Sequence, residues 1–181
     1  MTHTPRNTKL FISWSGSRAE CLGNRLREWV PLIIPGLDPF FSSQKGPTRG
    51  WLSVIERELK LAKYAFVCIT PDSLQSPWLN FETGALWLSA KKPSIYLILH
   101  GLAVDDVRGP LETFQCVPFE EERLRTMCRE IARTVKMDDG EFRKTWMANW
   151  PCLSRDVKSD LEAPALRTRK PIISARAKRG A

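Results

Sequence analysis

Two residues near the middle of the chain, Trp78 and Glu82, have types and a spacing that suit substrate chemistry. They stand four positions apart, and residues with this spacing lie on one face of a helix. A carboxylate beside an aromatic ring can stabilise the positive charge that develops on a sugar when a glycosidic bond breaks. The alternatives are a solvated glutamate on an amphipathic helix and a tryptophan that packs in the core, and for Trp78 we expect packing first.

The remaining residue types exclude several other chemistries. His3 and His100 are the only histidines, so a multi-histidine metal site is excluded and we predict no bound metal. Residues 46–50 lack the Gly-Lys-Ser/Thr ending of a phosphate-binding loop, and residues 15–17 contain one glycine where a dinucleotide-binding turn needs three. The five cysteines form no Cys-x-x-Cys pair, which favours reduced thiols over disulfides or metal ligands.

The net charge of +8 is concentrated near the C-terminus. Residues 163–181 contain six basic residues and no acidic one, which leaves residues 1–162 with a charge of +2. We expect a basic, disordered tail that contributes to solubility, with binding of an anionic partner as the alternative. A nucleic-acid partner is expected only through this tail.

No stretch approaches the 20 or so apolar residues that a membrane helix needs, and residues 1–9 lack the apolar centre of a secretory signal. We therefore expect a soluble protein in the cytoplasm, with no membrane contact.

Strand-like and helix-like segments alternate along the chain. Short apolar runs predict strands at 9–14, 37–41, 64–70, 95–99 and 113–117. Apolar residues at helical spacing predict helices that start near residues 17 and 51, and at 78–90 and 119–135. This alternation predicts an α/β fold of the flavodoxin-like kind, in which a mainly parallel five-stranded sheet lies between two layers of helices.

Ligands of such sheets bind beyond the carboxyl ends of the strands, where the strand order reverses. This places Trp14, Ser15 and Arg18 where a diphosphate or a nicotinamide could be held, although helix capping and surface charge explain them equally well. Lys45, in a polar loop over residues 42–50, could meet a phosphate or a neighbouring subunit. Trp51 starts a helix, where core packing is the more common role.

Four other tryptophans are assigned to packing, namely Trp29, Trp87, Trp146 and Trp150. The last two belong to residues 141–151, where aromatic residues recur at helical spacing. This segment could pack on the domain or form part of an assembly surface.

Three motifs, in the right order, resemble those of Toll/interleukin-1 receptor (TIR) domains, especially the stand-alone bacterial kind. Residues 11–15 (Phe-Ile-Ser-Trp-Ser) resemble the first-strand motif, with Trp14 in place of the usual tyrosine. Residues 42–50 resemble the loop that the family uses for self-association, and residues 76–82 resemble its Ser-x-Trp-x-x-x-Glu segment. The resemblance implies a TIR domain over residues 9–152, with an extension at 1–8 and a basic tail at 153–181.

Enzymatic TIR domains cleave NAD⁺ between nicotinamide and ribose and release ADP-ribose or a cyclic isomer. The resemblance therefore implies an NAD⁺ nucleosidase with catalytic Glu82, NAD⁺ as substrate and no further cofactor. It also implies a role in bacterial antiviral defence signalling, self-association through residues 42–50 and a separate sensor or effector protein. The expected substrate-binding residues are Trp14, Ser15, Arg18, Lys45, Trp51 and Trp78.

Two other functions stay open. The first is a TIR scaffold without catalysis, and the second is a nucleoside hydrolase or deoxyribosyltransferase-like enzyme that uses a similar carboxylate. A Glu82 side chain that points into a cleft beside Trp14 would favour an enzyme. A Glu82 side chain in bulk solvent, away from the strand ends, would favour the scaffold.

Overall fold

The computed structural model describes residues 8–42, 51–89 and 92–162. Its strands are β1 (Thr8–Ser13), β2 (Leu37–Phe41), β3 (Tyr64–Ile69), β4 (Ser94–Leu99) and β5 (Gln115–Pro118). Its α-helices are α1 (Ser17–Ile33), α2 (Trp51–Leu61), α3 (Pro77–Trp87), α4 (Glu121–Thr134) and α5 (Asp139–Glu162), and two short 3₁₀ helices, η1 (Val104–Asp106) and η2 (Gly109–Thr113), precede β5.

The five strands form one parallel sheet in the order β2-β1-β3-β4-β5. This is the flavodoxin-like order, whose reversal point lies between β1 and β3. The predicted fold class is therefore confirmed. Because all strands run the same way, the residues that follow β1, β2 and β3 meet at one edge of the sheet.

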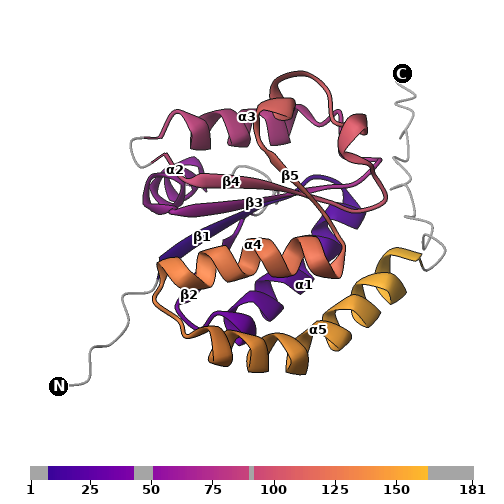
Figure 1. Ribbon diagram of the computed structural model, residues 1–181. Helices are drawn as coiled ribbons and strands as arrows, with labels where there is room; N and C mark the ends of the chain where they lie inside the picture. The colour runs from indigo at the N-terminus through magenta and orange to yellow at the C-terminus, as the bar shows by residue number, and fades with distance from the viewer. Residues whose placement is uncertain (1–7, 43–50, 90–91, 163–181) are drawn as a thin grey trace, which may run out of the picture.

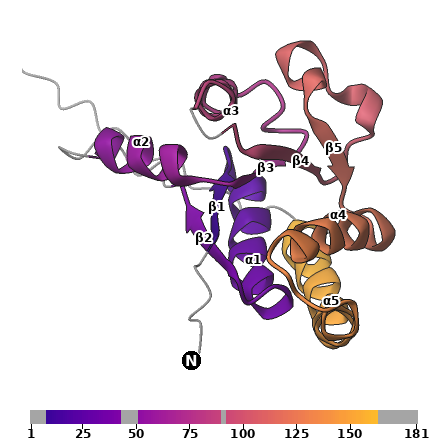
Figure 2. The same cartoon turned by 60° about the vertical axis from the view of Figure 1, so that its left-hand side comes forward.

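Helices cover both faces of the sheet (Figure 1; the rotated view in Figure 2 shows the same layers). On β3, Phe66 and Cys68 point to the side of α1, α4 and α5, whereas Ala65, Val67 and Ile69 point to the side of α2 and α3. This alternation follows from the two-residue period of a strand. Every residue of β3 is buried, as expected for a central strand with helices on both faces.

Helix α5 completes the lower layer in Figure 1 by packing on α1. Phe142, Trp146 and Trp150 are buried, and the Trp146 and Trp150 rings are stacked at 5.3 Å. Trp29 of α1 meets Trp146 edge-on, also at 5.3 Å. The aromatic residues of the segment at 141–151 therefore pack on the domain, as the first of the two expected roles requires.

The predicted start of the C-terminal tail at residue 153 is wrong. Residues 153–162 form the last turns of α5, where Leu153, Val157 and Leu161 recur every fourth position and are buried. Arg25 of α1 binds Asp160 at 2.7 Å. The charged residues between these three apolar positions made the segment look like a solvated tail in the sequence. Residues 163–181 of the expected tail and residues 1–7 of the expected extension lie outside the described part, and Thr8 already belongs to β1.

Trp87 is also misassigned, because the residue is 65% exposed. It occupies the last residue of α3, which ends there rather than at residue 90. Trp29, Trp146 and Trp150 are buried as predicted.

None of the helices in the described parts combines the length and apolar composition that would let it cross a membrane. All five cysteines are free thiols. Burial raises the pKa of the Cys68 thiol, and it raises that of Cys128 to about 12. Neither of these two side chains is therefore a thiolate at neutral pH.

Candidate functional site

Glu82 lies at the carboxyl edge of the sheet. It is in the middle of α3, a helix that starts with Ser76 as N-cap and Pro77 in the first turn. Its carboxyl Oε2 accepts a hydrogen bond from the hydroxyl of Ser13, the last residue of β1, and lies 3.4 Å from the Ser42 hydroxyl, just after β2. Glu82 is thus attached to the ends of two neighbouring strands, beside the reversal point between β1 and β3.

The Glu82 side chain has no exposed surface. This burial raises the pKa of its carboxyl to about 7, although the hydrogen bonds from Ser13 and Ser42, and the nearby Trp78 side chain, oppose the shift. Its second oxygen, Oε1, is buried and has no hydrogen-bond partner among the described residues. Near neutral pH the group therefore exchanges between acid and carboxylate, with Oε2 held by hydrogen bonds and Oε1 buried without a partner among the described residues.

The side chains of Trp78 and Glu82 meet, as their spacing predicts. The nearby Trp78 side chain lowers the pKa of the carboxyl, and its ring lies 5.6 Å from that of Phe81. Trp78 is half-buried against the core on the α2 and α3 side of the sheet. It therefore packs and contacts the carboxylate at once.

Trp14 reaches the site through Ser42. Its indole N–H donates to the Ser42 carbonyl, and its ring stacks on Phe41 at 5.3 Å within the core under α1. The Ser42 hydroxyl faces Glu82. Trp14 therefore holds the end of β2 in place beside the carboxylate.

Ser15 connects the turn after β1 to the start of α3, because the Ser76 hydroxyl donates to the Ser15 hydroxyl at 2.8 Å. The next residue, Gly16, has φ of +82°, and a Cβ there would lie 3.0 Å from Asp72 Oδ2. Only glycine suits such a position. Arg18 is exposed in the first turn of α1.

The Lys45 prediction lies outside the described residues, together with the rest of the loop at 43–50. Trp51 is the first residue of α2, but its side chain is outside the described part. The roles of both stay predictions.

Sequence reasoning gave no individual role to Ser13, Ser42 or Asp72. Asp72 accepts a hydrogen bond from the Thr70 hydroxyl at 2.7 Å, directly after β3. The sequence did contain a signal for these residues. A polar residue stands at or just after the end of each of three strands, and the ends of parallel strands meet at one edge of the sheet, where ligands bind.

Glu82 therefore adopts neither of the two orientations that would have separated an enzyme from a scaffold. It faces inward at the strand ends, covered from solvent. Among the described residues, no group of acidic, histidine or cysteine side chains is arranged to hold a metal ion.

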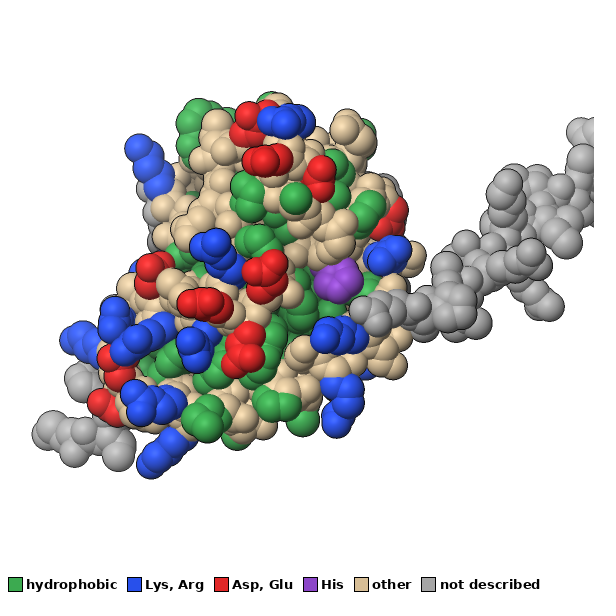
Figure 3. Space-filling model, turned by 45° about the vertical axis from the view of Figure 1, so that its right-hand side comes forward, with side chains coloured by type: hydrophobic (Ala, Val, Ile, Leu, Met, Phe, Trp, Pro, Cys, Tyr) green, Lys and Arg blue, Asp and Glu red, His purple; other side chains and the backbone are tan. Residues whose placement is uncertain are grey.

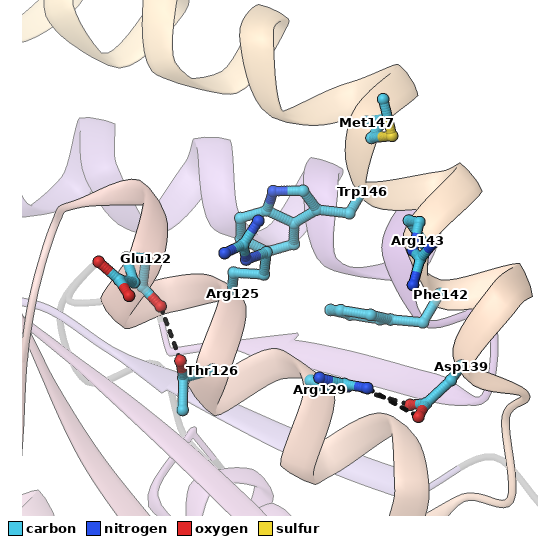
Figure 4. A pocket seen from close by; sticks show the side chains of 9 residues that line it. All are labelled: Glu122, Arg125, Thr126, Arg129, Asp139, Phe142, Arg143, Trp146 and Met147. Carbon is cyan, nitrogen blue, oxygen red and sulfur yellow. Dashed lines mark hydrogen bonds and ion pairs between the residues drawn. The ribbon is translucent and has the colours of Figure 1, made fainter.

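A separate hollow of about 390 Å³ lies between α4 and α5. Figure 4 shows Arg129 paired with Asp139 there, through hydrogen bonds of 3.1 and 2.8 Å. Phe142 and Trp146 also line it. Since both helices cover the other face of the sheet from α3 (Figure 1), this hollow is not part of the Glu82 site.

On the face shown in Figure 3, acidic and basic side chains are interspersed, with apolar side chains between them. The part of the chain described on that face thus presents no broad area of one charge.

No protein-family model matches the chain, and no curated protein matches it. Among solved structures, it is similar to the TIR domains of an activated Roq1 resistosome directly recognising the pathogen effector XopQ. The identity is 13%, the match covers 86% of this chain and 98% of that one, and the TM-score is 0.45.

Proposed function

We propose that the chain is a TIR-type NAD⁺ glycohydrolase with Glu82 as its catalytic carboxylate. The observation that supports this most directly is the state of Glu82: it is buried at the carboxyl edge of a flavodoxin-like sheet, Oε2 is held by Ser13, and Oε1 has no partner among the described residues. An unsatisfied buried oxygen is costly in a purely structural role. A ribose hydroxyl or a water molecule that donates to Oε1 would satisfy it.

The chemistry needs a single carboxylate. When the bond between ribose C1′ and the nicotinamide nitrogen breaks, its electron pair moves to that nitrogen and neutralises the cationic ring, so no acid has to protonate the leaving group. The ribose becomes positively charged, and the Glu82 carboxylate stabilises that charge. Water then forms the new C1′–O bond and loses a proton to Glu82, which passes it to solvent, and ADP-ribose results. Attack by a group within the same molecule would give a cyclic isomer instead.

Substrate reaches Glu82 only after part of its cover moves, because the side chain has no exposed surface. We propose that self-association through residues 42–50 produces this movement, since Ser42 touches Glu82 directly. Ser15 and Arg18 after β1, together with Trp78, Trp14, Lys45 and Trp51, are the proposed substrate contacts. The output would be NAD⁺ loss or a nucleotide signal in defence signalling in the cytoplasm.

The test is nicotinamide release from NAD⁺ by concentrated protein, with Glu82→Gln compared with the wild type. Glutamine keeps the shape and removes the charge, so we expect at least a hundredfold loss of rate. Glu141→Gln, at an exposed glutamate on α5, is the control and should match the wild type. Equal rates in the wild type and Glu82→Gln would rule out a catalytic Glu82.

A TIR scaffold without catalysis is the second candidate, and the complete burial of Glu82 favours it. In that case NAD⁺ would stay intact even in assembled protein, whereas Glu82→Gln would change stability alone. The third candidate is a nucleoside hydrolase or deoxyribosyltransferase-like enzyme. The same assay distinguishes it from an NAD⁺ glycohydrolase when free nucleosides replace NAD⁺, because only this third candidate would cleave them.

A further inference from the structure

A second cavity, of about 440 Å³, lies on the other side of α3 from Glu82. It is open to solvent on one side and lined by the C-terminal half of α3, the start of β4 and the 3₁₀ helix η2. Its lining includes Thr83, Gly84, Trp87, Ile95, Leu111 and Phe114. This volume falls within the range of small-molecule sites in proteins.

The hydroxyl of Thr83 marks this cavity as a site for a ligand. Thr83 is only 1% exposed, and its Oγ1 is buried without a hydrogen-bond partner among the described residues. Buried hydroxyls in proteins nearly always have a partner. A ligand in the cavity could supply the missing hydrogen bond.

Gly84 provides the space beside that hydroxyl. A Cβ built on Gly84 would meet no atom within 4 Å, although the residue lies inside a helix, where glycine is unfavourable. Its missing side chain leaves room for a ligand next to Thr83.

The remaining lining defines the chemical class. None of the described residues that line the cavity is charged, and most are apolar or aromatic. Trp87 at its rim is 65% exposed, and a flat ring placed against this indole would remove apolar surface from water. These surroundings favour an uncharged, planar aromatic molecule with one hydrogen-bonding group.

We propose that this cavity binds a small, uncharged aromatic molecule whose single polar group pairs with the Thr83 hydroxyl. The site is separate from the proposed NAD⁺ chemistry, because Glu82 on the same helix faces β1 and β2. Its test therefore succeeds or fails independently of any activity at Glu82.

The test uses 2-naphthol and naphthalene, which differ by one hydroxyl, with binding followed by the NMR resonance of the Trp87 indole N–H in full-length protein. We expect 2-naphthol to shift this resonance saturably. Thr83→Val keeps the shape of the side chain and removes its hydroxyl. It should weaken the binding of 2-naphthol about fivefold, the effect of one neutral hydrogen bond, and leave the binding of naphthalene unchanged. Gly84→Leu fills the cavity and should abolish both responses. Gly36→Ala, whose new Cβ would meet Val135 at an ordinary contact distance of 3.5 Å, lies outside the cavity lining and should not.

Three results would overturn the proposal. One is 2-naphthol binding that survives Gly84→Leu in protein whose other resonances are unchanged. Another is the same 2-naphthol affinity in Thr83→Val and the wild type. The third is a Trp87 shift that follows protein concentration without any ligand, since the face would then be a contact between copies of the chain.

Discussion

At the scale of single residues, the two oxygens of the Glu82 carboxyl have different surroundings. Ser13 and Ser42 face Oε2, whereas Oε1 has no partner in the described structure. A buried acceptor left without a partner costs about 1 to 3 kcal/mol. The fold therefore keeps an unfavourable group at the edge of the sheet where ligands of this fold class bind.

The pKa of Glu82 predicts how activity depends on pH. In the proposed reaction the carboxylate is the form that stabilises the ribose cation. Since burial raises the pKa of this group to about 7, we expect kcat/KM for NAD⁺ to rise as the pH passes from 6 to 8. Ser13→Ala removes a hydrogen bond that lowers this pKa and should move the midpoint to higher pH. The pH profiles of nicotinamide release in both proteins provide the measurement, and coincident midpoints would contradict the role of Ser13.

The same shift predicts a pH-dependent effect on stability. A carboxyl whose pKa rises from 4.5 to about 7 on folding stabilises the protein below pH 4.5, and this contribution is lost as the pH rises through 7. Glu82→Gln removes the charged form. Its free energy of unfolding, relative to the wild type, should be about 2 to 3 kcal/mol higher at pH 8 than at pH 5.

Urea unfolding at the two pH values measures this difference. Glu141→Gln, at an exposed position, should show no comparable dependence on pH. A Glu82→Gln effect that is equal at pH 5 and pH 8 would mean that the wild-type carboxyl is not perturbed by burial.

At the scale of elements, the alternation of apolar runs and amphipathic stretches was sufficient to predict the five strands and the first four helices. Their ends moved by a few residues, as for β5, which is Gln115–Pro118 rather than 113–117. The spacing of Trp78 and Glu82 also predicted their contact. Local patterns of this kind are visible in the sequence because helix and strand periods are fixed by the backbone.

Contacts between distant segments were not visible in that way. Ser13 and Glu82 are 69 positions apart and Ser42 and Glu82 are 40 apart, so no spacing rule connects them. Trp87 was misassigned because it is the last residue of α3. No apolar residue follows it at helical spacing within that helix, so the sequence does not show whether its side chain points to the core or to solvent. The end of α5 was missed because its charged residues resemble those of a solvated tail.

The packing of α5 predicts different effects for two truncations. A chain that ends at residue 152 loses the buried side chains of Leu153, Val157 and Leu161, worth about 5 to 9 kcal/mol together at roughly 1.5 to 3 kcal/mol each. A chain that ends at residue 162 keeps all three. Thermal unfolding should show a large loss of stability for the first truncation and little change for the second, and similar losses for both would contradict the packing described for α5.

At the scale of the whole molecule, charge is distributed very unevenly along the chain. Six basic residues and no acidic one lie in residues 163–181, against a net charge of +8 for the entire protein. Within the described structure, many charges are paired, as in the contacts of Arg129 and Arg133 with Asp139. The field that a polyanion would meet therefore comes mainly from the C-terminal residues.

This distribution predicts how the protein responds to a DNA duplex. Any affinity of the full chain should fall steeply with salt, as expected for contacts with phosphates, and deletion of residues 163–181 should abolish it. Fluorescence anisotropy with a labelled duplex at two salt concentrations is the measurement. Affinity that persists in the shortened chain would place a nucleic-acid surface on the folded domain.

The contact between α1 and α5 has an optical consequence. The Trp146 and Trp150 rings are nearly parallel, with 11° between their planes, and Trp29 stands across Trp146 at 77°. Indoles held so close together in fixed, unequal orientations couple their electronic transitions and give a circular dichroism couplet that isolated indoles lack. The circular dichroism of these tryptophans therefore reports whether α5 is packed on α1, without any added dye.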